Sequence, residues 1–405
     1  MQLVETHYIR KNHKFYKECE RLCKLSKLIY NEANYIVRQE FITNHKYTDN
    51  FTLQKQLQRK SPNYTALPAK VSQQTLKNLH INWRSFFKSI KEWKKNPEKF
   101  LGMPGLPNYK KIYSEVIYDA QAISKKKLKK NIVVLSQTII ELLFQHKGKR
   151  IKQARIIPEN KGLFKIEIVY KCNRKDKKLN KENYIGIDLG LNNLCAIVGN
   201  TITPKLINGK IPKSYNQYYN KKKAKLQENL PKKQYTSNRI QKLTNKRNRK
   251  IEDYMHRVSR HIINLCLTNN VGTIVIGYND NWKQEINMNR RNNQAFVNIP
   301  FYKLFKMLEY KADLVGIALE KQEESYTSKC SFMDNEELCH HSKYLGKRVK
   351  RGLFRSSTNG LISADINGAA NILRKRNSQF NINSNEGIQA VSVQPMRINP
   401  HKRVL

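Results

Sequence analysis

Acidic residues are scarce in this sequence, which has 31 Asp and Glu against 77 Lys and Arg and a formal net charge of +46 over 405 residues. A chain with this excess of positive charge is expected to bind a polyanion. Binding to nucleic acid is favourable because each phosphate that the protein neutralises releases condensed counterions. Nucleic acid is therefore the expected partner. A membrane surface is the alternative, but the basic residues are spread over the whole chain and do not form one amphipathic helix.

Long apolar runs are also missing, and none approaches the about 18 residues that a membrane span needs. The first residues, MQLVETHYIRKNHKFYKE, contain no apolar segment of the kind found in a secretory signal. We therefore expect a soluble protein of the bacterial cytoplasm, associated with the nucleoid. The few cysteines are odd in number, scattered and mostly set among apolar residues, which predicts reduced thiols. They are Cys19, Cys23, Cys172, Cys195, Cys266, Cys330 and Cys339.

The first quarter of the chain has the apolar periodicity of helices. Apolar residues recur at helical spacing from about Lys14 to Ile42, and again from Val71 until Pro97 ends the pattern. The second helix carries an aromatic stripe that includes Trp83 and Trp93; such a stripe could stack on bases, but we interpret it as core. These patterns predict a helical lobe over residues 14–100.

The next segment favours strands. NIVVLS, TIIELLF and LFKIEIVYKC are rich in β-branched and aromatic residues and are separated by basic or Gly-containing turns. We expect several antiparallel strands, forming a small barrel over residues 101–179 that residues 1–13 join.

From about residue 180 onward, strand and helix patterns alternate. IGIDLGLNNLCAIV predicts a strand, a turn and a second strand, and the basic run 221–250 predicts a helix that continues to Cys266. TIVIGYND predicts a third strand, Pro300 opens another helix, and GIALEKQEESYTSK predicts a returning strand. This order indicates an α/β sheet covered by helices. Residues 378–405 lack apolar periodicity and predict a flexible tail.

Two aspartates stand where carboxylates need an explanation. Asp188 interrupts an apolar strand, where its burial is costly unless it binds a metal or a partner, although it could also cap a turn. We expect its neighbours Gly186 and Gly190 to let a phosphate backbone approach closely. Asp365, in LISADINGAANILRK, lies where an extended segment enters a helix, and it could aim outward or cap that helix. Two-metal phosphodiester hydrolysis needs carboxylates from separate elements that converge on cations about 3.5–4 Å apart.

The motifs GIDLG, the basic helix, TIVIG, YTSKCS and ADINGAANILRK follow one another over most of residues 184–375. This order resembles the RuvC-like nuclease domain of TnpB proteins and of their relatives, the type V CRISPR effectors and the eukaryotic Fanzor proteins. The resemblance implies a multidomain α+β chain with a helical recognition lobe, a small β-barrel wedge domain and an α/β nuclease domain of RNase H fold. The nuclease domain would comprise residues 180–328 and 361–377. An insert at 329–360 would bind target nucleic acid.

The resemblance also implies a guide RNA, double-stranded target DNA and two Mg²⁺ ions held by Asp188, Asp365 and a third carboxylate. In most relatives the second motif is a strand that ends in an acid, but here that position is Gly277. Some relatives place a substitute glutamate just before YTSK, and Glu324 stands there. We therefore predict Glu324 as the third ligand, with Asp280 and Glu285 in reserve. The alternative is that Glu324 is an ordinary surface residue.

A zinc ribbon is common in relatives between YTSK and the last aspartate, as two CxxC pairs. Here Cys330 is followed by Met333, and the later pair is occupied by Arg355 and Thr358. We therefore expect no zinc, although Cys330 could in principle join ligands from the segment 339–341. GKRVKRGLFR, residues 346–355, predicts a basic arm that holds nucleic acid.

These patterns predict an RNA-guided, Mg²⁺-dependent DNA endonuclease of a transposable element, acting as a monomer in a ribonucleoprotein and cutting beside a short adjacent motif. The alternatives are a cleavage-deficient RNA-guided repressor, a CRISPR-associated type V effector and a transposase that joins DNA ends. The basic side chains expected to bind nucleic acid are Lys221, Lys222, Lys223, Arg239, Lys246, Arg247, Arg249, Lys347, Arg348, Lys350 and Arg351.

Overall fold

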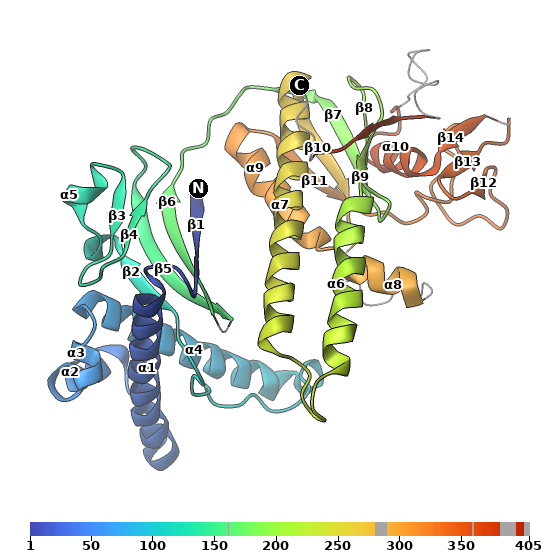
Figure 1. Ribbon diagram of the computed structural model, residues 1–405. Coiled ribbons are helices and arrows are strands. Elements are labelled where there is room, and N and C mark those ends of the chain that lie inside the picture. Colours follow the sequence, from blue (N-terminus) through green and yellow to red (C-terminus); the bar gives the residue numbers. More distant parts are fainter. Residues whose placement is uncertain (161, 280–289, 359, 381–393, 401–405) are drawn as a thin grey trace. The chain divides into compact units, whose positions relative to one another are not determined.

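The computed structural model describes the chain apart from residues 161, 280–289, 359, 381–393 and 401–405 (Figure 1). The chain divides into two compact units, Met1–Cys172 and Asn173–Leu405. None of the helices in the described ranges is both long enough and apolar enough to cross a membrane.

The first unit contains the helices and most of the strands that the sequence predicts for it. Its helices are α1 (Tyr16–Asn44), α2 (Asn50–Lys60), α3 (Pro62–Thr65), α4 (Ala69–Lys95) and α5 (Lys125–Leu128), with short 3-10 turns η1 (Pro97–Lys99) and η2 (Ala120–Ala122). Its strands are β1 (Gln2–Arg10), β2 (Val116–Asp119), β3 (Ile132–Val134), β4 (Glu141–Leu143), β5 (Ile151–Asn160) and β6 (Leu163–Lys171).

The strands of this unit form two antiparallel sheets. The larger has the order β1-β6-β5-β2, and β3 pairs with β4 in a sheet of two strands. The expected pairing of the N-terminal stretch is present, with Leu3 opposite Tyr170 and Arg10 opposite Leu163. Since β1 and β2 remain as the outer strands of the larger sheet within the described residues, closure into the predicted barrel is not confirmed.

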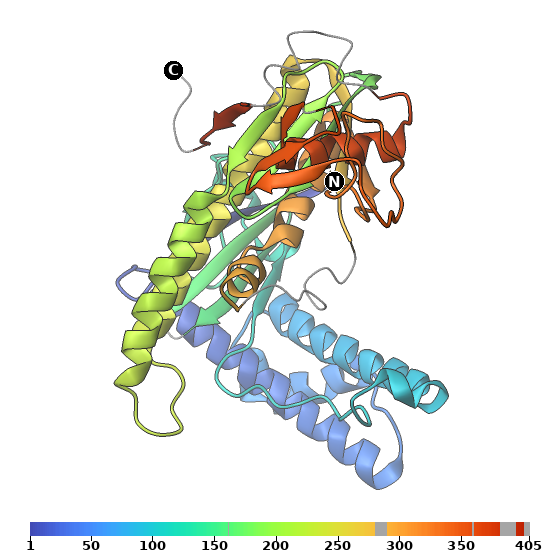
Figure 2. The same ribbon diagram turned by 90° about the vertical axis from the view of Figure 1, so that its right-hand side faces the viewer.

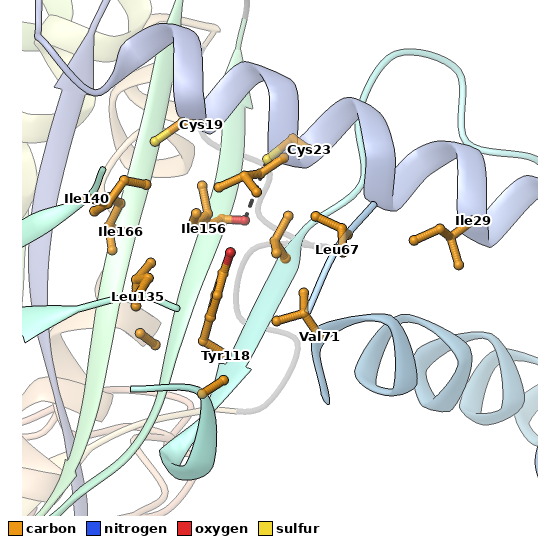
Figure 3. Packing of buried hydrophobic residues seen from close by; sticks show 14 of the residues in the cluster. Cys19, Cys23, Ile29, Leu67, Val71, Tyr118, Leu135, Ile140, Ile156 and Ile166 are labelled. Carbon is orange, nitrogen blue, oxygen red and sulfur yellow. Dashed lines mark hydrogen bonds between the residues drawn. The ribbon is translucent and has the colours of Figure 1, made fainter. Parts of the chain in front are cut away.

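One hydrophobic core joins the helices of this unit to the sheet. Cys19 and Cys23 of α1 point toward Ile156 and Ile166 of the sheet, and Cys23 Sγ lies 3.9 Å from the Ile156 carbonyl oxygen (Figure 3). Trp83 of α4 is fully buried against neighbouring phenylalanine rings, so the interpretation of the aromatic stripe as core is confirmed there. All the cysteines of the chain are free thiols, as predicted.

In its described residues, the second unit contains a mixed sheet, five helices and a small separate sheet. Its strands are β7 (Asn180–Leu189), β8 (Asn193–Gly199), β9 (Lys205–Asn208), β10 (Val271–Gly277), β11 (Ala318–Gln322), β12 (Lys347–Lys350), β13 (Leu353–Arg355), β14 (Leu361–Ser363) and β15 (Met396–Ile398). Its helices are α6 (Lys210–Glu228), α7 (Asn238–Thr268), α8 (Arg290–Val297), α9 (Phe301–Val315) and α10 (Ala364–Arg376).

The main sheet has the order β11-β10-β7-β8-β9-β15. β7, β8 and β9 form an antiparallel meander, whereas β10 and β11 run parallel to β7. Alternate residues of β7 face opposite sides, as in any strand. Ile187 and Leu189 pack with α7 and α9, while Tyr184 packs with α10. The predicted α/β sheet with helices on both faces is thus present (Figure 1).

Two expectations for this unit need correction. The basic run was predicted as one continuous helix, but α6 ends at Glu228 and α7 begins at Asn238, so the run forms a helical hairpin (Figure 2). Pro231 lies in the connection, where it cannot continue a helix. The C-terminal residues were predicted as a flexible tail, but β15 adds a parallel strand beside β9, with Arg397 opposite Leu206.

The glycines next to Asp188 serve packing, which corrects the expectation that they admit a phosphate backbone. A Cβ at Gly186 would lie 2.5 Å from Leu373 Cγ and 2.9 Å from the Ala369 carbonyl oxygen, so this glycine lets α10 lie close against the sheet. A Cβ at Gly190 would lie 2.6 Å from the Asn193 carbonyl oxygen, which makes that glycine a requirement of the turn between β7 and β8.

Candidate functional site

Asp188 lies near the C-terminal end of β7, at the level where two parallel neighbours also end. Ile187 is paired with Ile276 of β10, and Gly277 is paired with Gln322 of β11. The carboxyl ends of adjacent parallel strands therefore meet at one edge of the sheet, the usual place for a site in an open α/β fold. Asp188 is partly exposed there.

Asp365 approaches the same edge from α10. It lies in the first turn of that helix, but the N-cap residue is Ser363, so Asp365 does not cap the helix. Its Oδ2 instead accepts a hydrogen bond of 2.6 Å from Asn193 Nδ2 at the start of β8. One helical turn later, a Cβ at Gly368 would lie 2.9 Å from Asp188 Oδ2. The lack of a side chain at Gly368 thus leaves room for the Asp188 carboxylate against α10.

Glu324 fills the space that a side chain at position 277 would take. An ideal Cβ at Gly277 would overlap Glu324 Oε1 and would lie 2.6 Å from Ile372 Cδ1 of α10. The strand β11 ends at Gln322, and Glu324 begins the turn that follows, in which Thr327 N donates to the Glu324 carbonyl oxygen. The glutamate therefore reaches the end of β10 from a neighbouring segment, and only a glycine at 277 allows this.

Polar side chains fix the backbone on both sides of Glu324. Asn279 Oδ1 accepts a hydrogen bond of 3.1 Å from Glu324 N, and Thr327 Oγ1 donates one of 2.8 Å to the Glu324 carbonyl oxygen. Asn371, fully buried on α10, donates through Nδ2 to the Thr327 carbonyl oxygen at 2.9 Å. The turn that carries Glu324 is thus attached to the helix that carries Asp365.

Glu323 does not share this environment. Its carboxylate accepts a hydrogen bond of 2.5 Å from Lys375 Nζ and is mostly exposed. The two adjacent glutamates therefore differ in role, although they do so in a turn and not in the strand that the sequence predicts. The reserve candidates Asp280 and Glu285 lie outside the described residues.

The electrostatics of the three carboxylates show that they are close. Burial raises the pKa of Asp188 well above its usual range, and the negative charges of Glu324 and Asp365 raise it further. Burial and the charge of Glu323 raise the pKa of Glu324 to about 7. Like charges gathered in a partly buried place are unfavourable unless a cation or protons compensate them.

The donor set suits a hard cation such as Mg²⁺, which prefers carboxylate oxygens. Glu324 Oε1 is buried and has no hydrogen-bond partner, an unusual state for a carboxylate oxygen. Among the described residues, however, no three His, Cys, Asp or Glu side chains converge closely enough to hold one ion. The described residues therefore place the three carboxylates at one edge of the sheet without bringing them together as a metal-binding group.

Comparison with known proteins finds TnpB-like relatives. A family model described as "OrfB_IS605: Probable transposase" matches residues 167–283, and the model "Cas12f1-like, TNB domain" matches residues 301–372. The TnpB-like protein ORF457 of Acidianus two-tailed virus is 24% identical over 397 residues, which cover 89% of this chain and 83% of the viral protein. The chain is therefore similar to TnpB-like proteins.

Another relative and two solved structures extend the comparison. The TnpB-like protein MJ0751 of Methanocaldococcus jannaschii is 30% identical over 156 residues, 37% of this chain and 56% of that protein. A Cas12f1–sgRNA–target DNA complex matches with a TM-score of 0.55 and 17% identity, covering 89% of this chain and 82% of that one. CasPhi-2 (Cas12j) bound to crRNA matches with a TM-score of 0.50 and 9% identity, covering 92% and 98%. The chain therefore has a mixed α/β fold similar to that of Cas12 effectors.

Carboxylates hold the insert together, in the segment where the resemblance implied that zinc ligands could stand. Asp334 accepts hydrogen bonds from Ser357 N at 2.9 Å and from Ser357 Oγ at 2.6 Å, which joins the segments around Met333 and Thr358. The buried Glu336 accepts bonds from Ser331 N at 2.6 Å and Leu345 N at 2.7 Å. In the described part of the insert, Cys330 and the segment 339–341 do not form a group that could hold an ion.

The basic side chains predicted to bind nucleic acid differ in how exposed they are. Lys347, Arg348, Lys350 and Arg351 are all exposed on and beside β12, as are most of the selected lysines and arginines of the α6–α7 hairpin. Arg247 is different, because its Nε donates to Asn216 Oδ1 at 2.7 Å and its Nη2 donates to Asn298 Oδ1 at 3.1 Å. Its guanidinium supports the packing of the hairpin and is not free to bind phosphate.

Several residues of the site escaped the sequence reasoning. Asn193, Asn279, Gly368 and Asn371 position the carboxylates through contacts between distant segments. For Gly368 and Asn371 a signal was present, since a glycine and a fully buried asparagine inside an apolar helix are both unfavourable without a local reason. For Asn193 and Asn279 the sequence offers no such signal.

Proposed function

We propose that this protein is an RNA-guided DNA endonuclease of a transposable element, which cleaves target DNA beside a short adjacent motif. Asp188, Glu324 and Asp365 would be the ligands of two Mg²⁺ ions. The strand order of the main sheet, with an antiparallel meander followed by two parallel strands, supports the RNase H fold and the RuvC-like domain that the resemblance implies. The observation that carries the proposal is the Glu324 carboxylate in the space above Gly277.

The chain's own residues would prepare this chemistry. Asn193 orients Asp365 through its amide, and Asn279 with Thr327 fixes the backbone of Glu324. Asp188, Glu324 and Asp365 would hold Mg²⁺, which when bound would supply Lewis acidity for the hydrolysis of a phosphodiester. The exposed arginines of β12 and its turn are suited to hold the DNA backbone, because guanidinium groups bind phosphate in a bidentate manner.

In this proposal the remaining parts bind the nucleic acids. Residues 14–100 would form the recognition lobe, residues 1–13 with 101–179 the wedge domain, and residues 329–360 the target-binding insert. The guide RNA would read the target sequence by base pairing while the protein holds backbones.

The experiment uses the full chain loaded with the RNA from its transposon end. A labelled duplex with a matching target is offered in Mg²⁺ buffer, and both DNA binding and cleavage are measured. We expect wild type to bind and cut, and Asp188→Ala to bind without cutting. Binding without any cutting by wild type would favour the repressor, and full cutting by Asp188→Ala would refute the site.

A further inference from the structure

A second basic site lies on the helical layer that covers the other face of the main sheet. There α7, α9 and the residues after β15 enclose a groove of about 550 Å³, which we call the α7–α9 groove. Its lining includes Arg257, Arg260 and His261 of α7 and Lys311 of α9. Asp188 faces α10, whereas α7 and α9 cover the opposite face of the sheet. The groove is therefore separate from the carboxylate cluster.

Positive charge exceeds negative charge in the groove. Arg257, Arg260 and Lys311 line it, and the one acid of the lining, Asp253, already accepts a hydrogen bond of 2.9 Å from Arg257 Nε. Arg260 makes no hydrogen bond or ion pair within the described residues. Its exposed guanidinium therefore has its full set of donors available.

Lys311 is held in the wall of the groove with donor capacity to spare. Only 4% of its surface is exposed, and Nζ donates to the His256 carbonyl oxygen at 2.8 Å and to Ser259 Oγ at 2.7 Å. An ammonium group has three hydrogens, so one remains. Burial and the nearby charge of Arg260 lower the pKa of Lys311 to about 8, with no acidic side chain among the described residues that offsets this.

His261 adds a neutral donor. Its Nε2 is buried and has no hydrogen-bond partner, which is costly for a ring nitrogen unless a ligand supplies one. Burial lowers the pKa of His261, so the ring is neutral at pH 7 and can donate one N–H without adding charge. Two cations and one neutral donor around a groove fit an anion with several acceptor oxygens.

We propose that the α7–α9 groove binds a backbone phosphate of a nucleic acid, with Arg260 and Lys311 as its cations and His261 as a hydrogen-bond donor. A phosphodiester presents two charged oxygens, which match a guanidinium beside an ammonium. The inference rests on the proposed function only for the choice of RNA or DNA as the source of the phosphate.

The first test measures nucleic-acid affinity by fluorescence anisotropy, with one labelled single strand made as RNA and as DNA, over a series of chloride concentrations. Arg260→Gln should weaken binding about tenfold, since it removes a charged hydrogen bond. It should also reduce the slope of log affinity against log salt by about 0.7 for one single-strand phosphate contact. Lys306→Gln is the matched control, because Lys306 lies on α9, pairs with Glu309 at 2.7 Å and does not line the groove. If Arg260→Gln loses more affinity for the RNA strand than for the DNA strand, RNA supplies the phosphate, and the reverse result would identify DNA.

The second test does not depend on guided cleavage. With ¹⁵N-labelled histidine, inorganic phosphate should shift the His261 imidazole signals in wild type and leave them unchanged in Arg260→Gln. Equal affinities and slopes for Arg260→Gln and Lys306→Gln, with no phosphate shift at His261, would overturn the proposal. A protein that cuts no DNA but passes both tests would refute the proposed function and leave the groove assignment standing.

Discussion

Replacing Gly277 with alanine gives the sharpest test of the space that Glu324 occupies. The new methyl carbon would overlap Glu324 Oε1 and lie 2.6 Å from Ile372 Cδ1. Carbon atoms in contact prefer about 3.5–4.0 Å, so one of the neighbours must move by about 1 Å. We expect Glu324 to move, because it is carried by a turn, whereas Ile372 is fully buried in α10.

The displacement has two expected consequences. Overpacking of this kind typically costs about 1–3 kcal/mol of unfolding free energy. A ligand moved by about 1 Å typically costs about 100-fold in rate. We therefore expect Gly277→Ala to cut target DNA about 100-fold more slowly in single-turnover reactions with guide-loaded protein, with only moderate destabilisation in urea unfolding.

The control is Gly102→Ala, because a Cβ there meets nothing within 4 Å. A triple variant tests rescue. Glu324→Ala and Ile372→Val remove the two atoms that obstruct a side chain at position 277, and Gly277→Glu returns an acid to the end of the strand. We expect this combination to cut faster than Glu324→Ala alone. Wild-type cutting and stability in Gly277→Ala would refute the placement of Glu324.

Further predictions concern single contacts. Burial lowers the pKa of Lys311 from 10.5 to about 8. Between about pH 8 and pH 10.5 the unfolded state therefore binds more protons than the folded state, so the free energy of unfolding should rise with pH by up to about 3 kcal/mol. Urea unfolding of Lys311→Met should show no such rise. Asp334→Ala leaves Ser357 without its acceptor and should destabilise the insert by about 1–2 kcal/mol, seen as faster amide exchange there. Asn193→Ala removes the bond to Asp365 and should slow cleavage about tenfold without weakening DNA binding; unchanged cleavage would show that Asp365 needs no such support.

Much of the fold was predictable because it follows local patterns. The long helices α1 and α4 carry clear apolar periodicity, whereas the strand around Asp188 and the strand β10 contain short continuous apolar runs. The hairpin between α6 and α7 was missed because the charge run concealed a break at Pro231. The strand β15 was missed because three residues carry no period and gain their partner β9 only in the folded chain.

The candidate site was predictable from local patterns only where a residue conflicts with its setting. Asp188 in an apolar strand is such a conflict. Glu324 was predicted from the family resemblance instead, because Gly277 stands where most relatives have an acid. The contacts that support the site are different, because Asn193 meets Asp365 across 172 positions and no local pattern records that. The role of Gly368 likewise depends on which helix face meets β7.

The central claim is that Glu324 supplies the third carboxylate, and adjacent variants test it most directly. Single-turnover cleavage of a matched target is measured for Glu324→Ala and, as the control, for Glu323→Ala, whose partner is Lys375. The claim predicts that Glu324→Ala loses cleavage while keeping target binding, and that Glu323→Ala cuts at nearly the wild-type rate. Full cutting by Glu324→Ala, or loss of cutting by Glu323→Ala instead, would contradict it.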